Sequence, residues 1–494
     1  MRPVRQAALV HVGVVLIVFP LLFATHTRWI FTHFSGDAYL EDSGWLAYLF
    51  GSADPLLHNP LAENNLSFYA HHVSPHIFLF GAPLATLFRL TGIQIFAYHQ
   101  GLFFGLFFVA VYLIAARPGL RRRDWIVAVV SALLLGALSN ALWQAAAYPH
   151  DEIAMFALVA LAIACWLGQH RALFAFCLLW LPLVREDGGF YAAVVCLSCL
   201  FVERDPSQPW NRSARLLLVL ALAGLLASAC SFLIKAWFFP GFDAFAKNFA
   251  GGKSFSPAPW SHLTMAFALE RVGSMLQNLN IVPVLVGSAV LAMFDWRYLT
   301  GVVLLSPIYL IHLVARRPEH GHFTLYFALP WLLPCAIWLA VFARRSSLSR
   351  ARFTEAIVIL GVALALCAPI QAVAGMPAEF WFVAQEAVRR PVVDIRRMQD
   401  FVLLARKGFA ATDVERSNLK QCVSQAIAAL VPNEVRPDEV LTPDSDLRTC
   451  QMITLMRGEV FYGELATRSE AAGFRRMSSK ENAEVWVATA AGPR

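Results

Sequence analysis

Long apolar runs separated by short polar connections make up most of the first 374 residues. A helix needs about 20 apolar residues to cross a bilayer, and runs of that kind recur along this part of the chain. The pattern predicts a mainly helical membrane protein with eleven spans. The first covers residues 7–25, and the others cover residues 95–116, 124–143, 152–168, 171–185, 188–202, 214–238, 280–294, 299–314, 323–342 and 353–374.

A twelfth apolar stretch, residues 76–90, is shorter and is interrupted by Pro83 and Arg89. We interpret it as an interfacial or re-entrant helix, a half-span. This choice decides the topology, because counting the stretch as a full span would place Arg121, Arg122 and Arg123 outside.

Basic residues orient the helices with the N-terminus in the cytoplasm. Arg2 and Arg5 precede the first span, which lacks a small-residue cleavage motif and is therefore interpreted as a retained signal anchor. Nearly every basic loop then lies inside, as the positive-inside rule requires. The exception is Arg316 and Arg317, which fall outside close to His322.

Polar residues gather on the outer side in this orientation. The long outer loops are residues 29–75 and 239–279. The shorter outer segments are Tyr148–Glu152, Arg185–Asp187 and Arg316–His322. Isolated charges in hydrocarbon cost roughly 2.5–3.5 kcal/mol or more, so these groups are expected to face water or one another around one site.

Residues 375–494 are polar and contain no span, which predicts a separate soluble α/β domain, with 1–374 as the membrane domain. The pattern there predicts amphipathic helices at residues 391–405 and 419–430 and short strands at 452–456 and 484–488. Parity of the spans places this domain in the periplasm.

Composition agrees with a membrane class, since 58% of the residues are hydrophobic and only 15% are charged. The net charge of +7 does not indicate nucleic-acid binding, because the arginines form short clusters between apolar segments. Seven of the nine cysteines lie in predicted spans. The other two, Cys422 and Cys450, can form a disulfide in an oxidising periplasm or can both be free.

Each candidate site residue also has an ordinary structural interpretation. His72 precedes Ser-Pro, a helix-entry signal, and the segment of His150 and Glu152 can be a solvated loop. Arg185, Glu186 and Asp187 can form an internal ion pair, and Gly188-Gly189 after them permits a broken helix or a tight turn. Lys235 can snorkel outward.

His322 and Tyr326 lie one helical turn apart in sequence at an outer helix end, where they can anchor the helix in the interface or contact ligand. No Walker loop, nucleotide-binding glycine motif, nucleophile elbow or His-Glu-x-x-His helix is present in the sequence. Direct use of ATP is therefore not expected.

The order of several motifs resembles a known family. They are Leu40-Glu-Asp-Ser-Gly-Trp45, His71-His-Val-Ser-Pro75, Tyr148-Pro-His-Asp-Glu152 and Val184-Arg-Glu-Asp187. The pattern is similar to that of bacterial membrane proteins of domain-of-unknown-function family 2079, which are grouped with the GT-C glycosyltransferases. The resemblance covers roughly residues 30–375. This chain departs from it at Val73, Asp151 and Arg185, where Phe, Pro and Lys are usual.

The resemblance implies a multi-span core with an outer catalytic pocket and a catalytic base in the first outer loop. The matching position is Asp42, with Asp37 and Glu41 as neighbours, although Asp42 before Ser-Gly can also simply cap a helix. The leading hypothesis is periplasmic glycosyl transfer from a polyprenyl-phosphate-linked sugar to an unidentified acceptor.

Under this hypothesis Arg185, Lys235 or Arg317 would hold the donor phosphate, while Glu186 and Asp187 fix Arg185 or contact sugar hydroxyls. His72, His150 and Glu152 can bind a divalent cation, although a phosphate held by arginine needs none. The alternatives are a transporter or flippase of a lipid-linked or small solute, and a non-catalytic scaffold. A transporter would be marked by paired discontinuous helices in two related halves.

Overall fold

A computed structural model describes residues 46–58, 67–116, 122–147, 150–203, 211–240, 262–316, 318–344, 352–373, 395–412, 420–441, 445–457, 462–480 and 482–488. The predicted first span, the acidic residues Asp37, Glu41 and Asp42, and Arg317 lie outside these ranges. The chain forms two compact units. One comprises Met1–Phe19, Ala70–Val73 and Leu102–Val383, and the other Pro20–Tyr69, Ser74–Gly101 and Ala384–Arg494.

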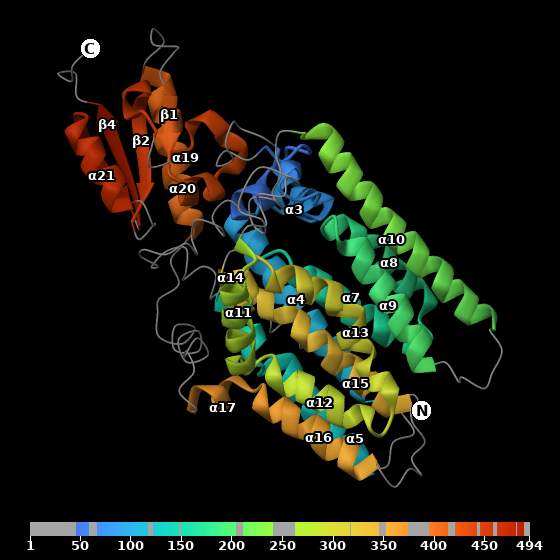
Figure 1. The fold of residues 1–494 in the computed structure, drawn as a ribbon. Helices are drawn as coiled ribbons and strands as arrows, with labels where there is room; N and C mark the ends of the chain where they lie inside the picture. Colours follow the sequence, from blue (N-terminus) through green and yellow to red (C-terminus); the bar gives the residue numbers. More distant parts are fainter. Residues whose placement is uncertain are drawn as a thin grey trace. The chain divides into compact units, whose positions relative to one another are not determined.

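The first unit is helical throughout its described residues (Figure 1). After α4 (Gly92–Ala115), whose first turns belong to the second unit, its elements are α5 (Arg122–Ala137), α6 (Asn140–Ala147), α7 (Ile153–Leu167), α8 (Arg171–Val184), α9 (Gly188–Glu203), α10 (Arg212–Phe238), α11 (Met265–Gln277), α12 (Val282–Ala292), η5 (Trp296–Leu299), α13 (Thr300–Leu313), α14 (Pro318–Gly321), η6 (Leu325–Trp331), α15 (Leu332–Arg344), α16 (Arg352–Ala365) and α17 (Ala368–Val373).

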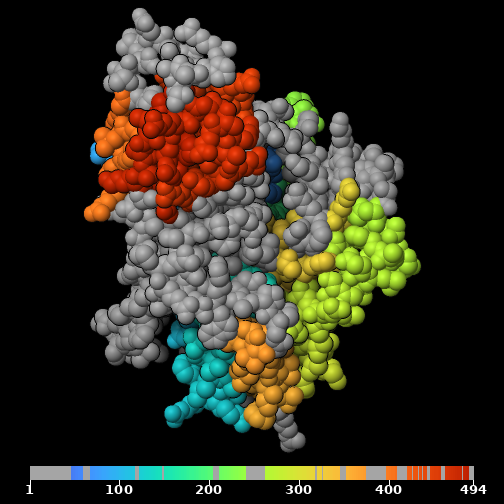
Figure 2. Space-filling view, turned by 90° about the vertical axis from the view of Figure 1, so that its left-hand side faces the viewer, coloured from blue at the N-terminus to red at the C-terminus, as the bar shows by residue number. Residues whose placement is uncertain are grey.

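Two helices form the centre of this unit. Every residue of α7 is buried, as is every residue of α15 except its last two. The helices around them expose large apolar side chains; α10, which packs beside α9, exposes Leu226, Leu233 and Trp237 (Figure 1). Side chains of α11 and α12, in lime green, likewise lie on the surface (Figure 2), among them Met265 and Leu269. An apolar exterior around an apolar centre is typical of a protein surrounded by lipid.

Each predicted span within the described residues coincides with one or two helices, but most of these are short. Four are long and apolar enough to cross a membrane, namely Gly92–Ala115, Arg212–Phe238, Trp296–Leu313 and Tyr326–Arg344. A fifth crossing is possible if α11 and α12, bent by 76° at their junction, count as one. The segment α11 was not expected, because residues 265–277 were predicted to be part of an outer loop.

Two predicted spans, 124–143 and 353–374, are each broken into two helices. The breaks, between α5 and α6 and between α16 and α17, are joined by backbone hydrogen bonds. The N–H of Asn140 donates to Leu366 O over 2.8 Å, and that of Ala368 to Leu138 O over 2.7 Å. Irregular backbone at membrane depth requires such internal partners.

The second unit contains η2 (Phe68–Ala70, whose last residue belongs to the first unit), α3 (Pro75–Phe88) and the first turns of α4. The predicted half-span is α3, a helix of 14 residues that ends where Arg89 takes a left-handed conformation. Its length of roughly 21 Å is less than the thickness of the hydrocarbon. Gly81 in α3 packs directly on the backbone of Phe50, where a Cβ atom would lie 2.0 Å from the carbonyl oxygen.

The C-terminal part of this unit is a small mixed sheet with helices. Its elements are α19 (Ile395–Thr412), β1 (Lys420–Val423), α20 (Gln425–Leu430), η7 (Pro432–Glu434), η8 (Pro437–Glu439), η9 (Leu447–Thr449), β2 (Cys450–Met456), α21 (Tyr462–Ala471), β3 (Phe474–Lys480) and β4 (Ala483–Ala488). The strand order is β1-β2-β4-β3, with β1 parallel to β2 and the other pairs antiparallel. The helix α21 packs on β2 and β3, and α19 packs on β4.

The predicted strands 452–456 and 484–488 are confirmed as β2 and β4. The predicted helix 419–430 is wrong in its first half, where Lys420–Val423 pairs with β2 as a strand. Cys422 and Cys450 form a disulfide with a Cα–Cα distance of 5.7 Å, and both lie in the apolar core under α21. The predicted domain boundary at residues 374 and 375 lies outside the described residues.

Candidate functional site

The break between α8 and α9 creates the candidate site. The helix α8 ends at Val184, Arg185 is extended, and α9 begins at Gly188. A Cβ atom on Gly188 would lie 1.9 Å from Leu181 O, and one on Gly189 would lie 2.3 Å from Gly224 O of α10. Only glycine allows such a close approach of backbone segments, so the sequence Arg-Glu-Asp-Gly-Gly turns the chain sharply with three charges at the turn.

Glu186 joins three distant segments. Its side chain is 5% exposed. One carboxylate oxygen lies 3.1 Å from His72 Nδ1 and 3.3 Å from Lys235 Nζ, and the other accepts the backbone N–H of Val73 over 2.9 Å. Lys235 also donates to the carbonyl oxygen of His71. Lys235 therefore turns inward and anchors α10 to this segment instead of snorkelling outward.

Arg185 is held by carboxylates on two sides. Its Nε and Nη2 atoms donate to the two carboxylate oxygens of Asp187, over 2.7 and 2.5 Å, in a bidentate pair. Its Nη1 atom forms an ion pair with Glu152, which directly precedes α7. The side chains of all three residues are no more than 15% exposed. The arrangement locks the ends of α7, α8 and α9 together.

An aromatic pair and a further carboxylate, that of Asp151, adjoin these charges. His150 stacks on Tyr326 with 4.3 Å between ring centroids, and its Nδ1 atom lies 2.9 Å from Asp151 Oδ1. Asp151 is 1% exposed, and the charges of His72 and Arg185 both act on it. His72, His150, Glu152, Arg185, Glu186, Asp187, Lys235 and Tyr326 thus belong to one charged cluster in the first unit, called the polar cluster below.

Neighbouring charges keep the buried carboxylates of Glu186 and Asp151 ionised. Burial raises the pKa of Glu186, but the charges of His72, Lys235 and Arg185 and the hydrogen bond from His72 outweigh it, so this pKa lies well below its ordinary value. The same holds for Asp151. Burial raises its pKa, but the charges of His150, His72 and Arg185 and the hydrogen bond from His150 outweigh burial, so the pKa of Asp151 also lies well below its ordinary value.

Two predicted residues lie differently from expectation. His322 lies in the turn after α14 and Tyr326 in η6, so they do not share an α-helix. His322 Nε2 pairs with Glu270 of α11 over 2.7 Å at an exposed position. Arg317 and the predicted acidic trio Asp37, Glu41 and Asp42 lie outside the described residues.

Arg271 is a candidate that the sequence interpretation missed. It lies in α11, is 4% exposed, and donates through Nη2 to the carbonyl oxygens of Ala315 and Arg316. Within the described part of the chain, its Nε and Nη1 atoms have no hydrogen-bond partner, although Nη1 lies 3.6 Å from the Glu270 carboxylate. The available signal was a charged residue in the apolar segment Met265–Gln277.

Metal binding has little support in the described residues. They contain no group of three or more His, Cys, Asp or Glu side chains arranged to hold an ion. The imidazole of His72 faces Glu186 and that of His150 faces Asp151, so each is already committed to a carboxylate.

Comparisons with known proteins add little to this geometry. No protein-family model matches the chain, so its resemblance to family 2079 stays a prediction. No curated protein matches it either. Among solved structures, the crystal structure of ArnT from Cupriavidus metallidurans in the apo state is similar at 14% identity, over 98% of this chain and 99% of that chain, with a TM-score of 0.44. A TM-score of this size does not establish a common fold, and function is therefore inferred from the site.

Proposed function

We propose that this chain is a membrane glycosyltransferase of GT-C type that uses a polyprenyl-phosphate-linked sugar at the periplasmic face. The observation that supports the proposal most directly is the polar cluster itself. Three carboxylates, a guanidinium and an ammonium group, buried at the ends of apolar helices, require a large compensating network. Such groups in a membrane protein mark a functional site by default.

The residues divide into positioning and binding roles. Each guanidinium nitrogen of Arg185 already contacts a carboxylate of Asp187 or Glu152, so we assign Arg185 to holding α7, α8 and α9 in register. Arg271 has N–H groups left over, and a buried guanidinium pairs well with phosphate, so we assign the donor phosphate to Arg271. The stacked rings of His150 and Tyr326 present polar edges for sugar hydroxyls.

The catalytic base is assigned on the resemblance alone to Asp42, with Asp37 and Glu41 as neighbours. A carboxylate in this role removes the proton of the acceptor hydroxyl as the acceptor oxygen attacks the anomeric carbon and the polyprenyl phosphate leaves. No divalent cation is required for this step if Arg271 and its neighbours neutralise the leaving phosphate.

A transporter or flippase is the second candidate, and the bent pair of α11 and α12 favours it. Discontinuous helices are typical of transport sites, although they are expected in two related halves. The described residues contain one such pair, since it alone is bent by more than 40° at a short break.

The two functions are distinguished with purified protein in liposomes and a panel of polyprenyl-phosphate sugars. We expect sugar release from the donor that is abolished by Asp42→Asn and reduced at least tenfold by Arg271→Met. Glu203→Gln, at the opposite end of α9 from the polar cluster, is the matched control and should leave turnover unchanged. Movement of the intact lipid that survives Asp42→Asn, with no turnover by the unmodified protein, would establish the flippase instead.

A further inference from the structure

A hollow of about 510 Å³ lies in the C-terminal sheet domain, between α21 and the edge strand β3. It is lined by Tyr462, Ala466 and Glu470 of α21 and by Arg475 and Arg476 of β3. Pockets of roughly 300–1,000 Å³ are the size that small molecules occupy. Four of its lining residues, Tyr462, Ala466, Phe474 and Trp486, belong to the core of the sheet domain or pack against it, whereas Glu470, Arg475 and Arg476 add charged groups outside that core. The proposed transferase site does not include this hollow.

A buried carboxylate fixes the wall of this hollow. Glu484 of β4 is 0% exposed and accepts hydrogen bonds from the side chains of Arg457, Arg476, Tyr462 and Trp486. Burial raises its pKa, but the bonds from Arg457, Tyr462 and Arg476 outweigh burial and hold the pKa below its ordinary value. The carboxylate stays ionised at neutral pH and orients these side chains before any ligand arrives.

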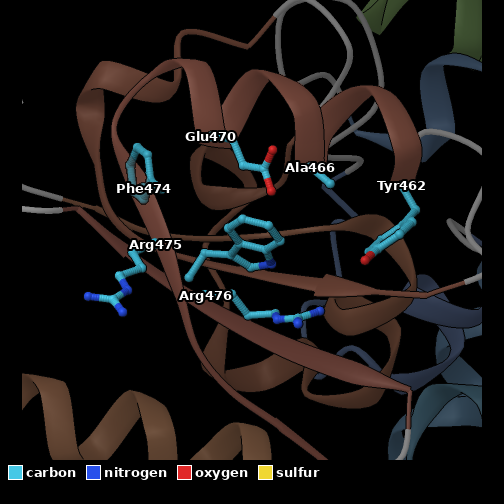
Figure 3. Close-up of a pocket in the computed structure, with 7 residues that line it drawn as sticks. Tyr462, Ala466, Glu470, Phe474, Arg475 and Arg476 are labelled. Atoms are coloured by element: carbon cyan, nitrogen blue, oxygen red, sulfur yellow. The ribbon is translucent and has the colours of Figure 1, made fainter.

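The hollow offers both donors and acceptors. In Figure 3, Tyr462 and Glu470 point from α21 toward its middle, Arg476 lies across from them, and Arg475 points away. A guanidinium carries five N–H donors, of which Glu484 takes one from Arg476. The Glu470 carboxylate and the Tyr462 oxygen accept. Phe474 and Trp486, both mostly buried, supply apolar ring surface.

This combination selects the class of ligand. An isolated anion would meet the negative charge of Glu470, and an apolar molecule would leave the polar groups desolvated without partners. A sugar ring carries hydroxyls that donate and accept, and its C–H faces pack on aromatic edges. We propose that this hollow binds a saccharide unit, in a site separate from the polar cluster.

Binding is tested on the full-length protein in nanodiscs by saturation-transfer NMR, with methyl glucoside, glucuronic acid and inorganic phosphate as probes. We expect methyl glucoside to bind. Glu470→Gln, on an exposed position, should weaken its binding about tenfold. Ala466→Trp should fill the hollow and abolish binding. Glu464→Gln, an equally exposed substitution on α21 at a residue that does not line the hollow, is the matched control and should change the dissociation constant less than about twofold.

Each alternative outcome overturns the proposal. Saccharide binding that is unchanged in both Glu470→Gln and Ala466→Trp would place the sugar elsewhere in the chain. Binding of phosphate but not of methyl glucoside, lost in Arg476→Ala, would make the hollow an anion site. No binding of any probe by the unmodified protein would make it an empty surface depression. Glu470→Gln keeps the hydrogen bonds of Glu484, so its melting temperature should match that of the unmodified protein.

Discussion

Removing the charge of Glu186 should destabilise the first unit strongly. Glu186→Gln leaves Lys235, whose side chain is 12% exposed, as a buried cation without its carboxylate partner. Breaking a buried pair in this way costs about 3–5 kcal/mol. The weakened contacts to His72 and to the Val73 N–H add to the loss. We expect Glu186→Gln to lower the free energy of unfolding in mixed micelles by about this amount.

A double-mutant cycle isolates the pair. Lys235→Met alone leaves Glu186 with His72 and Val73, and Glu186→Gln with Lys235→Met leaves no unpaired charge. The double variant should therefore be more stable than the sum of the single losses predicts, by about 1–3 kcal/mol. Glu203→Gln, on the same helix, breaks a partly exposed pair with Arg344 and should change stability by no more than about 1 kcal/mol.

The stability difference between the unmodified protein and Glu186→Gln should also depend on pH in a defined direction. Because the folded pKa of Glu186 is depressed below the ordinary glutamate value of 4.5, its contribution to stability is complete above that value and is lost as the pH falls through the folded pKa. The difference between unmodified protein and Glu186→Gln should thus be constant near neutral pH and shrink in strong acid. A coupling near zero, or a difference that grows on acidification, would refute the ion-pair network.

Two further predictions concern packing and the disulfide. Gly189→Ala should lower the melting temperature and the free energy of unfolding, the latter by about 1–3 kcal/mol, because its Cβ would collide with Gly224 O. Gly361→Ala, where a Cβ meets nothing within 4 Å, is the control and should cause no loss of stability. Equal melting temperatures of the two variants would contradict the close packing of α9 on α10. Replacing Cys422 and Cys450 by serine should destabilise the sheet domain by about 3–4 kcal/mol, seen as faster proteolysis of that domain, and unchanged cleavage rates would show that the bond is dispensable.

The sequence predicted the apolar helices and the break after Val184, because both follow from local patterns. A run of charges followed by two glycines cannot continue an apolar helix. The sequence did not predict which charges would pair. Glu186 and His72 are 114 residues apart, and Lys235 reaches them from the far end of α10. Such contacts depend on how helices pack, which the period of apolar residues alone does not specify.

The misassigned parts of the C-terminal domain have a similar origin. The strand β3 was missed because all its residues after Phe474 are exposed, so the apolar alternation that marks a strand is lacking. Lys420–Val423 was interpreted as helix because it runs directly into α20. Its pairing with β2 depends on a partner about 30 residues later in the chain, and tertiary pairing overrides local preference there.

How the bent pair of α11 and α12 lies in the membrane bears on whether the C-terminal domain can keep its disulfide. With 13 and 11 residues, these helices are about 20 and 16 Å long, so neither crosses the hydrocarbon by itself. If the other ten predicted spans and the predicted cytoplasmic N-terminus hold, a single crossing by this pair places the C-terminal domain on the oxidising side of the membrane. If they dip in and return, the tail stays among reducing thiols, where the bond between Cys422 and Cys450 would not persist. With the rest of the predicted topology unchanged, the redox state of Cys422 and Cys450 would therefore show whether α11 and α12 together cross the bilayer or re-enter it.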